Sequence, residues 1–465
     1  MQRRNFIKLS LVACTSLMLP ISSSAADVDF DQIEFDDNVY NANSAQTIMI
    51  YMYGGASSLA GNLSNIDQIR SESQSDYDSY FRDITLTTNE CWQEAGGTYM
   101  EDMMDAGDMT LFRSCYSHVR EDTNNKAHGS CTVQNQKGSF DEDGGGIVAN
   151  LAQVLKREGV IGENSVLPFV TFEGESQFYS QGKEPLESYL KPVGLDERFS
   201  NPYKRYVRDW YKYTAEERET DGYNNDDDPN EDSGDGKTIL GFDPALDAQM
   251  NTLAQSHNSN EKIKSAFDKR GSLGNFVDDI ALATTPDLGE DAYPTNSDFA
   301  EKIEAAIKVM SNNPDTKIIT MGTGGLGGWD DHNDARNYVT RTEELFASLK
   351  SGVAHLKAVE KIDNISIMVF GEFGRNVNLN SALGWDHGNL QNLYVLGGNG
   401  YFTHKGVVGE TELDVTGSIN RLYLKPKPNT EQFEPLSIAA TLYKIFGITN
   451  PEILTDGNEA ISITL

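Results

Sequence analysis

The chain has 465 residues, of which 38% are hydrophobic and 23% are charged, so it can build a large core and its composition argues against disorder. It carries 38 Lys and Arg against 71 Asp and Glu, a formal net charge of −33. Such an excess of negative charge repels polyanions and argues against non-specific binding to nucleic acid or to an anionic membrane surface.

The amino terminus has the pattern of an export signal. Arg3 and Arg4 open it, an apolar run covers residues 9–21, and three small residues precede Asp27. Paired arginines followed by Phe and Lys are typical of twin-arginine signals, which carry folded proteins, so we expect a signal peptide over residues 1–26 and a periplasmic or secreted protein. A lipoprotein box ending at Cys14 stays open as an alternative. No later stretch reaches the ~18 apolar residues that a membrane span needs.

Beyond the signal, β-branched runs alternate with stretches of helical spacing. Strands are expected at residues 46–52, 109–115, 166–172, 317–321, 365–370 and 393–396. Helices are expected at residues 147–155, 204–216, 243–257, 260–283, 297–311, 345–356 and 435–446. The alternation predicts one α/β domain over residues 27–465, with a mainly parallel central sheet and helices on both faces. An acidic, Tyr- and Asn-rich insertion is expected near residues 173–240.

Three of the expected strands run into glycine-rich polar loops, at residues 54–55, 322–328 and 371–375. Because ligands in such sheets bind beyond the carboxyl ends of the strands, these loops predict a site there. Residues 322–327 (GTGGLG) satisfy a dinucleotide fingerprint, but no apolar helix follows directly. Flexible backbone around a site is therefore favoured over nicotinamide or flavin binding.

Two short segments pair an aspartate with a histidine. Asp330 and His332 follow one expected strand, and Asp386 and His387 follow another. Carboxylate and imidazole are ligands of zinc, manganese or iron, so two such pairs at strand ends indicate a metal site. The alternative for each pair is a turn held by hydrogen bonds.

The other histidines divide by context. His128 lies in a polar loop and is a candidate for the site, and His404 is a candidate for a further ligand. His118, His257 and His355 have the context of surface or helix-packing residues.

Two further patterns are weak. Cys91, Cys115 and Cys131 allow at most one disulfide, their pairing stays open, and their spacing fits no zinc pattern. The acidic run 224–236 resembles half of a calcium loop, but its glycine is misplaced, and a charged loop is favoured.

Several of these segments, taken in order, resemble a bacterial family of unknown function, family 1501, which is grouped with the alkaline phosphatase and sulfatase superfamily. The segments are residues 53–59, 128–138, 328–332, 372–375, 386–388, 397–398 and 439–447. The resemblance extends over nearly the whole mature chain and implies an alkaline-phosphatase-like fold. One departure stands out, because the family usually has Asp where this chain has Ser57 in the first turn.

Two hypotheses follow from the residues and the resemblance. The first is an exported, metal-dependent hydrolase of phosphate or sulfate esters, with zinc, manganese or calcium held by Asp330, His332, Asp386 and His387. Its catalytic candidates are Ser57 on position alone, His128, and Arg375 as the partner of a small anionic substrate. The second is a non-catalytic, metal-stabilised binding or assembly protein of the cell envelope, favoured by Ser57 and by the lack of a clear nucleophile. A redox enzyme is a distant third.

Overall fold

The computed structural model of the protein describes residues 29–73, 77–81, 84–174, 176–182, 185–195, 252, 280, 283–414 and 421–464. The expected export signal with Cys14, the acidic run 224–236 and His257 lie outside the described residues. So do the helices expected at 204–216, 243–257 and 260–283, apart from residues 252, 280 and 283.

An eight-stranded sheet forms the centre of the molecule, with the strand order β4-β3-β5-β1-β6-β7-β2-β8. The strands are β1 (Gln46–Met52), β2 (Met109–Cys115), β3 (Phe169–Thr171), β4 (Val193–Gly194), β5 (Ile318–Gly322), β6 (Ile365–Gly371), β7 (Gln391–Gly397) and β8 (Gly406–Val408). All neighbours pair in parallel except β7, which runs antiparallel to both β6 and β2. The predicted mainly parallel α/β sheet is confirmed, and the strand expected at 393–396 is the one that reverses.

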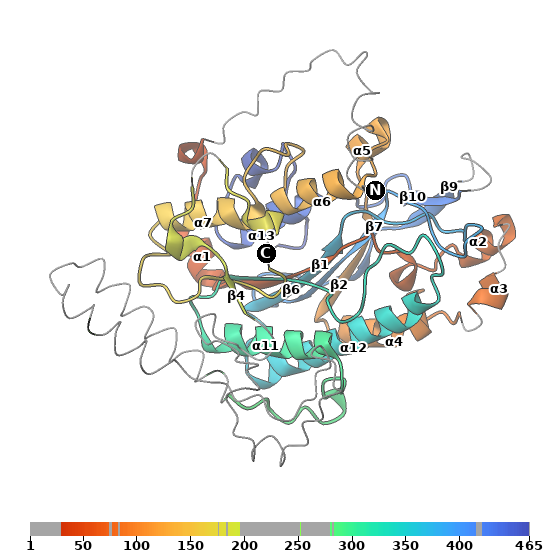
Figure 1. Ribbon diagram of the computed structural model, residues 1–465, viewed down its shortest axis with the longest axis horizontal. Coiled ribbons are helices and arrows are strands. Elements are labelled where there is room, and N and C mark those ends of the chain that lie inside the picture. Colours follow the sequence, from red (N-terminus) through yellow and green to blue (C-terminus); the bar gives the residue numbers. More distant parts are fainter. Residues whose placement is uncertain are drawn as a thin grey trace, which may run out of the picture.

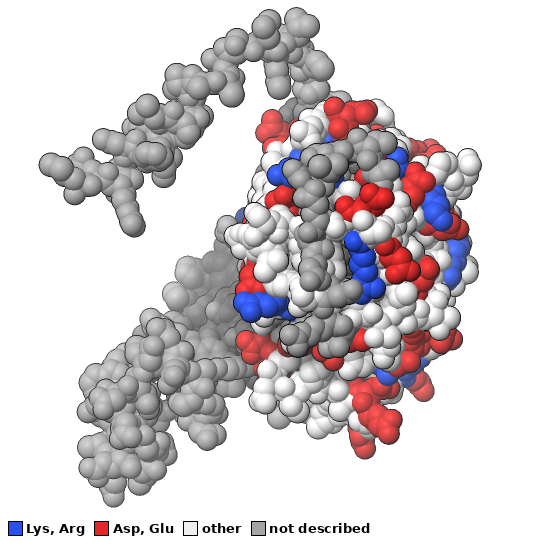
Figure 2. Space-filling view, turned by 90° about the vertical axis from the view of Figure 1, so that its right-hand side faces the viewer, with Lys and Arg blue, Asp and Glu red and all other residues white. Residues whose placement is uncertain are grey.

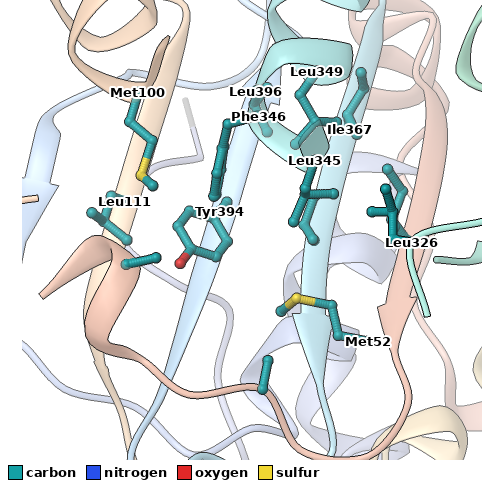
Figure 3. Close-up of a cluster of buried hydrophobic side chains, with 14 of the residues drawn as sticks. Met52, Met100, Leu111, Leu326, Leu345, Phe346, Leu349, Ile367, Tyr394 and Leu396 are labelled. Atoms are coloured by element: carbon teal, nitrogen blue, oxygen red, sulfur yellow. The ribbon is translucent and has the colours of Figure 1, made fainter. Parts of the chain in front are cut away.

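The two faces of the sheet carry separate hydrophobic clusters. Along β1, Ile48 and Ile50 point into one cluster, while Met49 and Tyr51 point into the other, as the two-residue period of a strand requires. Helices α4, α11 and α12 cover the first face, and α7 and α13 cover the second (Figure 1). Figure 3 shows the first cluster, where Leu345, Phe346 and Leu349 of α12 face the sheet.

The described α-helices are α1 (Asp37–Asn43), α2 (Ile66–Glu72), α3 (Tyr77–Tyr80), α4 (Gly97–Asp105), α5 (His118–Thr123), α6 (His128–Lys137), α7 (Ile147–Arg157), α11 (Asp298–Asn312), α12 (Asn337–Ala358) and α13 (Ser437–Ile445). A separate ribbon pairs β9 (Thr411–Asp414) with β10 (Tyr423–Pro426). None of the helices in the described part of the chain is long and apolar enough to cross a membrane.

One sequence-based expectation about His128 is wrong. It does not lie in a polar loop but is the first residue of α6. The helix is polar along most of its length and contains Gly129, so its sequence lacks the apolar stripe that predicts a helix. Its packing against the loop after β6 stabilises it instead, through Asn135, which donates to the carbonyls of Gly371 and Glu372.

The three described cysteines are all buried and free. Cys115 lies at the end of β2, and burial raises the pKa of its thiol above the ordinary value. These side chains therefore act as small apolar residues of the core.

Candidate metal centre

Loops from the centre of the sheet meet beyond the carboxyl ends of β1, β5 and β6. Asp330 and His332 lie in the loop between β5 and α12. His387 lies in the connection between β6 and β7, and it reaches this edge because β7 is antiparallel and starts here. His128 comes from the start of α6. The two Asp–His segments therefore follow strands that point the same way, as the sequence had suggested, and the segment with His387 stays at this edge because β7 runs back from it.

Four side chains gather at this point. One ligand atom from each of His128, Asp330, His332 and His387 lies within 4.8 Å of the other three. Nε2 of His332 is 2.9 Å from Nε2 of His387 and 3.2 Å from Oδ1 of Asp330. Nε2 of His128 is 3.4 Å from the same oxygen and makes no hydrogen bond.

An oxygen atom lies next to Nδ1 of each imidazole. His128 Nδ1 is 2.6 Å from Glu372 Oε2, and His387 Nδ1 is 2.6 Å from the carbonyl oxygen of Lys126. His332 Nδ1 is 3.4 Å from Asp386 Oδ1. A carbonyl or carboxylate oxygen only accepts, so Nδ1 donates in each case and Nε2 keeps its lone pair. All three lone pairs then belong to atoms of the shared cluster.

Burial and nearby charges set the protonation of His387 and Asp330 in a way that favours binding of a cation. Burial, and to a smaller extent the positive charge of Arg375, lowers the pKa of His387 to about 4, so the ring is neutral at pH 7. Burial by itself raises the pKa of Asp330, but its hydrogen bond and charge interaction with Arg375 outweigh this effect, and the net pKa is lowered. The site therefore offers a neutral imidazole beside an ionised carboxylate.

The donor set fits a transition-metal ion. Two unprotonated Nε2 atoms at 2.9 Å repel each other unless a proton or a cation lies between them. Two ligand atoms on a tetrahedral ion with bonds of about 2.05 Å are about 3.3 Å apart, close to the distances between these donors. Three nitrogens and one carboxylate suit zinc or manganese, whereas calcium takes about six to eight oxygen ligands.

Arg375 has a structural role that differs from the expected one. Its side chain is 1% exposed, and its guanidinium donates to the carbonyls of Gly54, Gly55 and Trp385 and to Oδ1 of Asp330, the last at 2.6 Å. It therefore joins the loops after β1, β5 and β6 and positions Asp330. The expected pairing of Arg375 with an anionic substrate does not fit this geometry.

The remaining expected residues lie around the cluster or away from it. Asp386 contacts Nδ1 of His332 through Oδ1, and its Oδ2 is 3.1 Å from Nε of Arg421. Asp386 is therefore a partner of His332 and not a member of the four-residue cluster. Ser57 is buried and lines a small internal cavity with Trp329, Tyr338 and Phe346; none of the four clustered residues lines that cavity.

His404 also lies elsewhere. Its Nε2 is 2.8 Å from the carbonyl oxygen of Gly397, the last residue of β7, and its Nδ1 is 3.1 Å from Oγ1 of Thr110 in β2. Gly397 is at the opposite end of β7 from His387, so His404 is not a further ligand of this cluster.

Sequence reasoning gave no role to Glu372. Its side chain is 4% exposed, with Oε2 on His128 and Oε1 accepting from the backbone N–H of Gly54 at 2.8 Å. The available signal was a lone acidic residue directly after the buried strand β6, next to Phe373. The ring of Phe373 packs on His387 and His128, with centroids 4.6 and 5.0 Å away.

The comparisons with known proteins agree with the resemblance. The sequence model of a family described as a protein of unknown function, DUF1501, matches residues 211–459, more than half of the chain. The chain belongs to this family. The matched part contains Asp330, His332 and His387, whereas Ser57 and His128 precede it. The DUF1501 match is thus shorter than the nearly full-length one expected. No curated protein matches the sequence.

Solved structures similar to this DUF1501 chain include the following three. Ps i-CgsB, solved in complex with k-i-k-neocarrahexaose, has 10% identity and a TM-score of 0.36 and covers 88% of this chain and 74% of its own. The lipoteichoic acid synthase LtaP from Listeria monocytogenes has 9% identity and a TM-score of 0.34, with coverages of 93% and 78%. The phosphonate monoester hydrolase SpPMH from Silicibacter pomeroyi has 12% identity and a TM-score of 0.31, with coverages of 90% and 78%. With such scores, these similarities say nothing about the activity of this chain.

Proposed function

We propose that the protein is an exported, metal-dependent hydrolase of phosphate or sulfate esters. The observation that supports the proposal most is the set of three imidazoles, each with Nδ1 next to an oxygen and Nε2 in one cluster with the Asp330 carboxylate. A divalent cation held by these four residues supplies Lewis acidity at an ester oxygen.

The chain's own residues then have defined tasks. Each ring is held in one tautomer and orientation by an oxygen next to its Nδ1, from Glu372, Asp386 or the carbonyl of Lys126. Hydrogen-bond partners of metal ligands commonly have this role. Arg375 holds Asp330 in place from a buried position. His332 and Asp330 have side chains 37% and 52% exposed, so a substrate can reach the cluster from solvent.

Replacing His387 by Ala tests the proposal. The variant loses one ligand atom, so bound zinc or manganese, measured by elemental analysis of the purified protein, is expected to fall by at least tenfold. Thermal stability with metal present is expected to fall too, because metal binding stabilises the folded state. Cleavage of aryl phosphates and aryl sulfates is expected to be lost in the same variant.

A matched control is His118→Ala, which removes an exposed histidine at the start of α5. It should keep metal, stability and activity. If the wild-type protein binds no divalent metal at any pH tested, and His387→Ala changes nothing, the four residues are turn formers held by hydrogen bonds and the proposal is wrong.

The position of Ser57 favours a second candidate, a metal-stabilised envelope protein without turnover. Ser57 is buried in a separate cavity that none of the four clustered residues lines. In that case His387→Ala lowers metal content and stability, while the wild-type protein cleaves none of the esters. The activity panel on metal-loaded wild-type protein separates the two candidates.

A further inference from the structure

A separate pocket of about 410 Å³ lies beside the candidate metal centre. It is lined by residues at the carboxyl ends of β1, β3 and β5: Tyr53, Phe172, Glu173, Thr323 and the glycines of the loop 322–328, together with Lys302 of α11. None of the four clustered residues lines it, but the loop continues from Gly328 to Asp330. The volume falls within the roughly 300–1,000 Å³ of small-molecule sites.

The lack of a side chain at Gly322 leaves room for two of the residues that line this pocket. At Gly322 a Cβ would lie 3.3 Å from both Oε2 of Glu173 and the ring of Tyr53. Glycine at this position therefore lets both side chains pack against the end of β5. This gives the GTGGLG segment a use other than holding a dinucleotide.

Glu173 is the unusual group of the pocket. Both of its carboxyl oxygens are buried and neither makes a hydrogen bond. Burial raises its pKa to about 7, although the nearby hydroxyls of Tyr53 and Ser176 act in the opposite direction. A buried carboxyl without partners is costly, so it favours a ligand that brings hydrogen-bond donors.

The other lining groups define the chemistry of that ligand. The hydroxyl of Tyr53 accepts from Gln136 Nε2 at 2.8 Å and lies near the Glu173 carboxyl. Lys302 Nζ lies 3.4 Å from the carbonyl oxygen of Gly324 and adds a further donor. The rings of Tyr53 and Phe172 supply apolar walls. Flat apolar walls beside several donors and acceptors suit a ring that carries hydroxyl groups.

We propose that this pocket binds a hydroxyl-rich ring, that of a sugar or a cyclitol, which forms the alcohol part of the ester. The assignment to an ester rests on the proposed function, whereas binding of the ring does not. The Glu173 oxygens are covered in the free protein, so the carboxyl turns toward the ligand on binding and accepts from its hydroxyls.

Binding of unesterified rings tests the inference without any need for turnover. The probes are myo-inositol and the methyl glycosides of glucose, galactose and mannose, with cyclohexylmethanol as a ring of similar size that lacks ring hydroxyls. Affinities for the full chain are measured by ligand-observed NMR. At least one hydroxylated probe is expected to bind roughly tenfold more tightly than cyclohexylmethanol, as one or two well-made hydrogen bonds allow.

Variants assign that preference to the pocket. Glu173→Leu should abolish the tenfold preference, and Glu173→Gln, which keeps an acceptor, should restore part of it. Glu343→Gln, an exposed position on α12, should leave it unchanged. The inference is overturned if no hydroxylated probe is preferred, or if the preference survives in Glu173→Leu. If the rings bind but no ester is cleaved, the proposed hydrolase fails while the pocket assignment stands.

Discussion

The imidazoles of the cluster are oriented by oxygens that come from other parts of the chain. Glu372 is 244 residues from His128, and the Lys126 carbonyl is 261 residues from His387. Such outer partners fix which nitrogen carries the proton and so decide whether a histidine can bind a metal at all. The cluster therefore depends also on the buried Glu372 and on the Lys126 carbonyl, neither of which belongs to the Asp–His motifs.

Replacing Glu372 by Gln tests this dependence. The amide can present its NH₂ group to His128 Nδ1, which favours the other tautomer and directs a proton toward the cluster. Metal affinity, measured by competition with a chelator, is expected to fall roughly 10–100-fold, with the fold retained. Glu343→Gln is the matched control and should not change the affinity; an equal loss in both variants would contradict the assignment.

Glu173 is expected to give the protein a distinctive pH dependence. Its pKa is about 7 in the folded protein against an ordinary 4.5, so between these values the folded state holds more protons than the unfolded state. The contribution of Glu173 to the free energy of unfolding therefore falls as pH rises from 4.5 to 7, and the penalty is complete above 7.

Glu173→Gln removes this penalty. The variant is expected to be more stable than the wild type by roughly 2 kcal/mol at pH 8 and to equal it below pH 4.5. Urea unfolding of both proteins at several pH values measures the difference. A difference that does not change with pH would show that Glu173 keeps its ordinary pKa in the folded state.

At the scale of secondary-structure elements, the loops that form the site contact one another directly through their backbones. A Cβ at Gly384 would lie 2.3 Å from the carbonyl carbon and oxygen of His332, and one at Gly388 would lie 2.5 Å from the carbonyl carbon of Arg375. Trp385 N donates to the Asp331 carbonyl at 2.7 Å. These contacts fix the β6–β7 connection against the loop after β5.

Gly384→Ala is therefore expected to separate the two loops. The clash is with backbone, which cannot rotate away, so a loss of roughly 1–3 kcal/mol in stability and a fall in metal content are expected together. Gly328→Ala, four residues before His332, is the control, because its Cβ would meet nothing within 4 Å. Calorimetry and elemental analysis of the two variants give the comparison, and equal behaviour would exclude the loop contact as the cause.

The whole molecule is strongly acidic, with a net charge of −33. On the face in Figure 2, acidic and basic side chains are interspersed and form no continuous basic patch. An anionic substrate therefore meets a repulsive overall field, and capture of an anion depends on the local charge of the site and on salt.

Export is a prediction for the whole molecule and rests on the sequence alone. Replacing both Arg3 and Arg4 by Lys is expected to leave the precursor in the cytoplasm, because twin-arginine signals require the pair. Cell fractionation of the native host, with an unaltered chain beside it, measures the effect. Normal export of the variant would rule out the twin-arginine route.

The sequence by itself determined the elements with strong local patterns. Buried strands such as β1 and β6 and amphipathic helices such as α7 and α11 have a periodicity that follows from burial of one face or of both. Two Asp–His segments after glycine turns also indicated a metal site, since those residue types carry that chemistry wherever they converge.

Features that depend on contacts between distant parts of the chain could be determined only from the tertiary structure. The reversal of β7, the helical state of His128, the burial of Arg375 and the outer position of Asp386 each depend on partners far away in the chain. The pairing of Glu372 with His128 depends on such a partner as well. A residue's neighbours in sequence set its local conformation, but its protonation, exposure and ligand geometry are set by whichever loops meet it at the edge of the sheet.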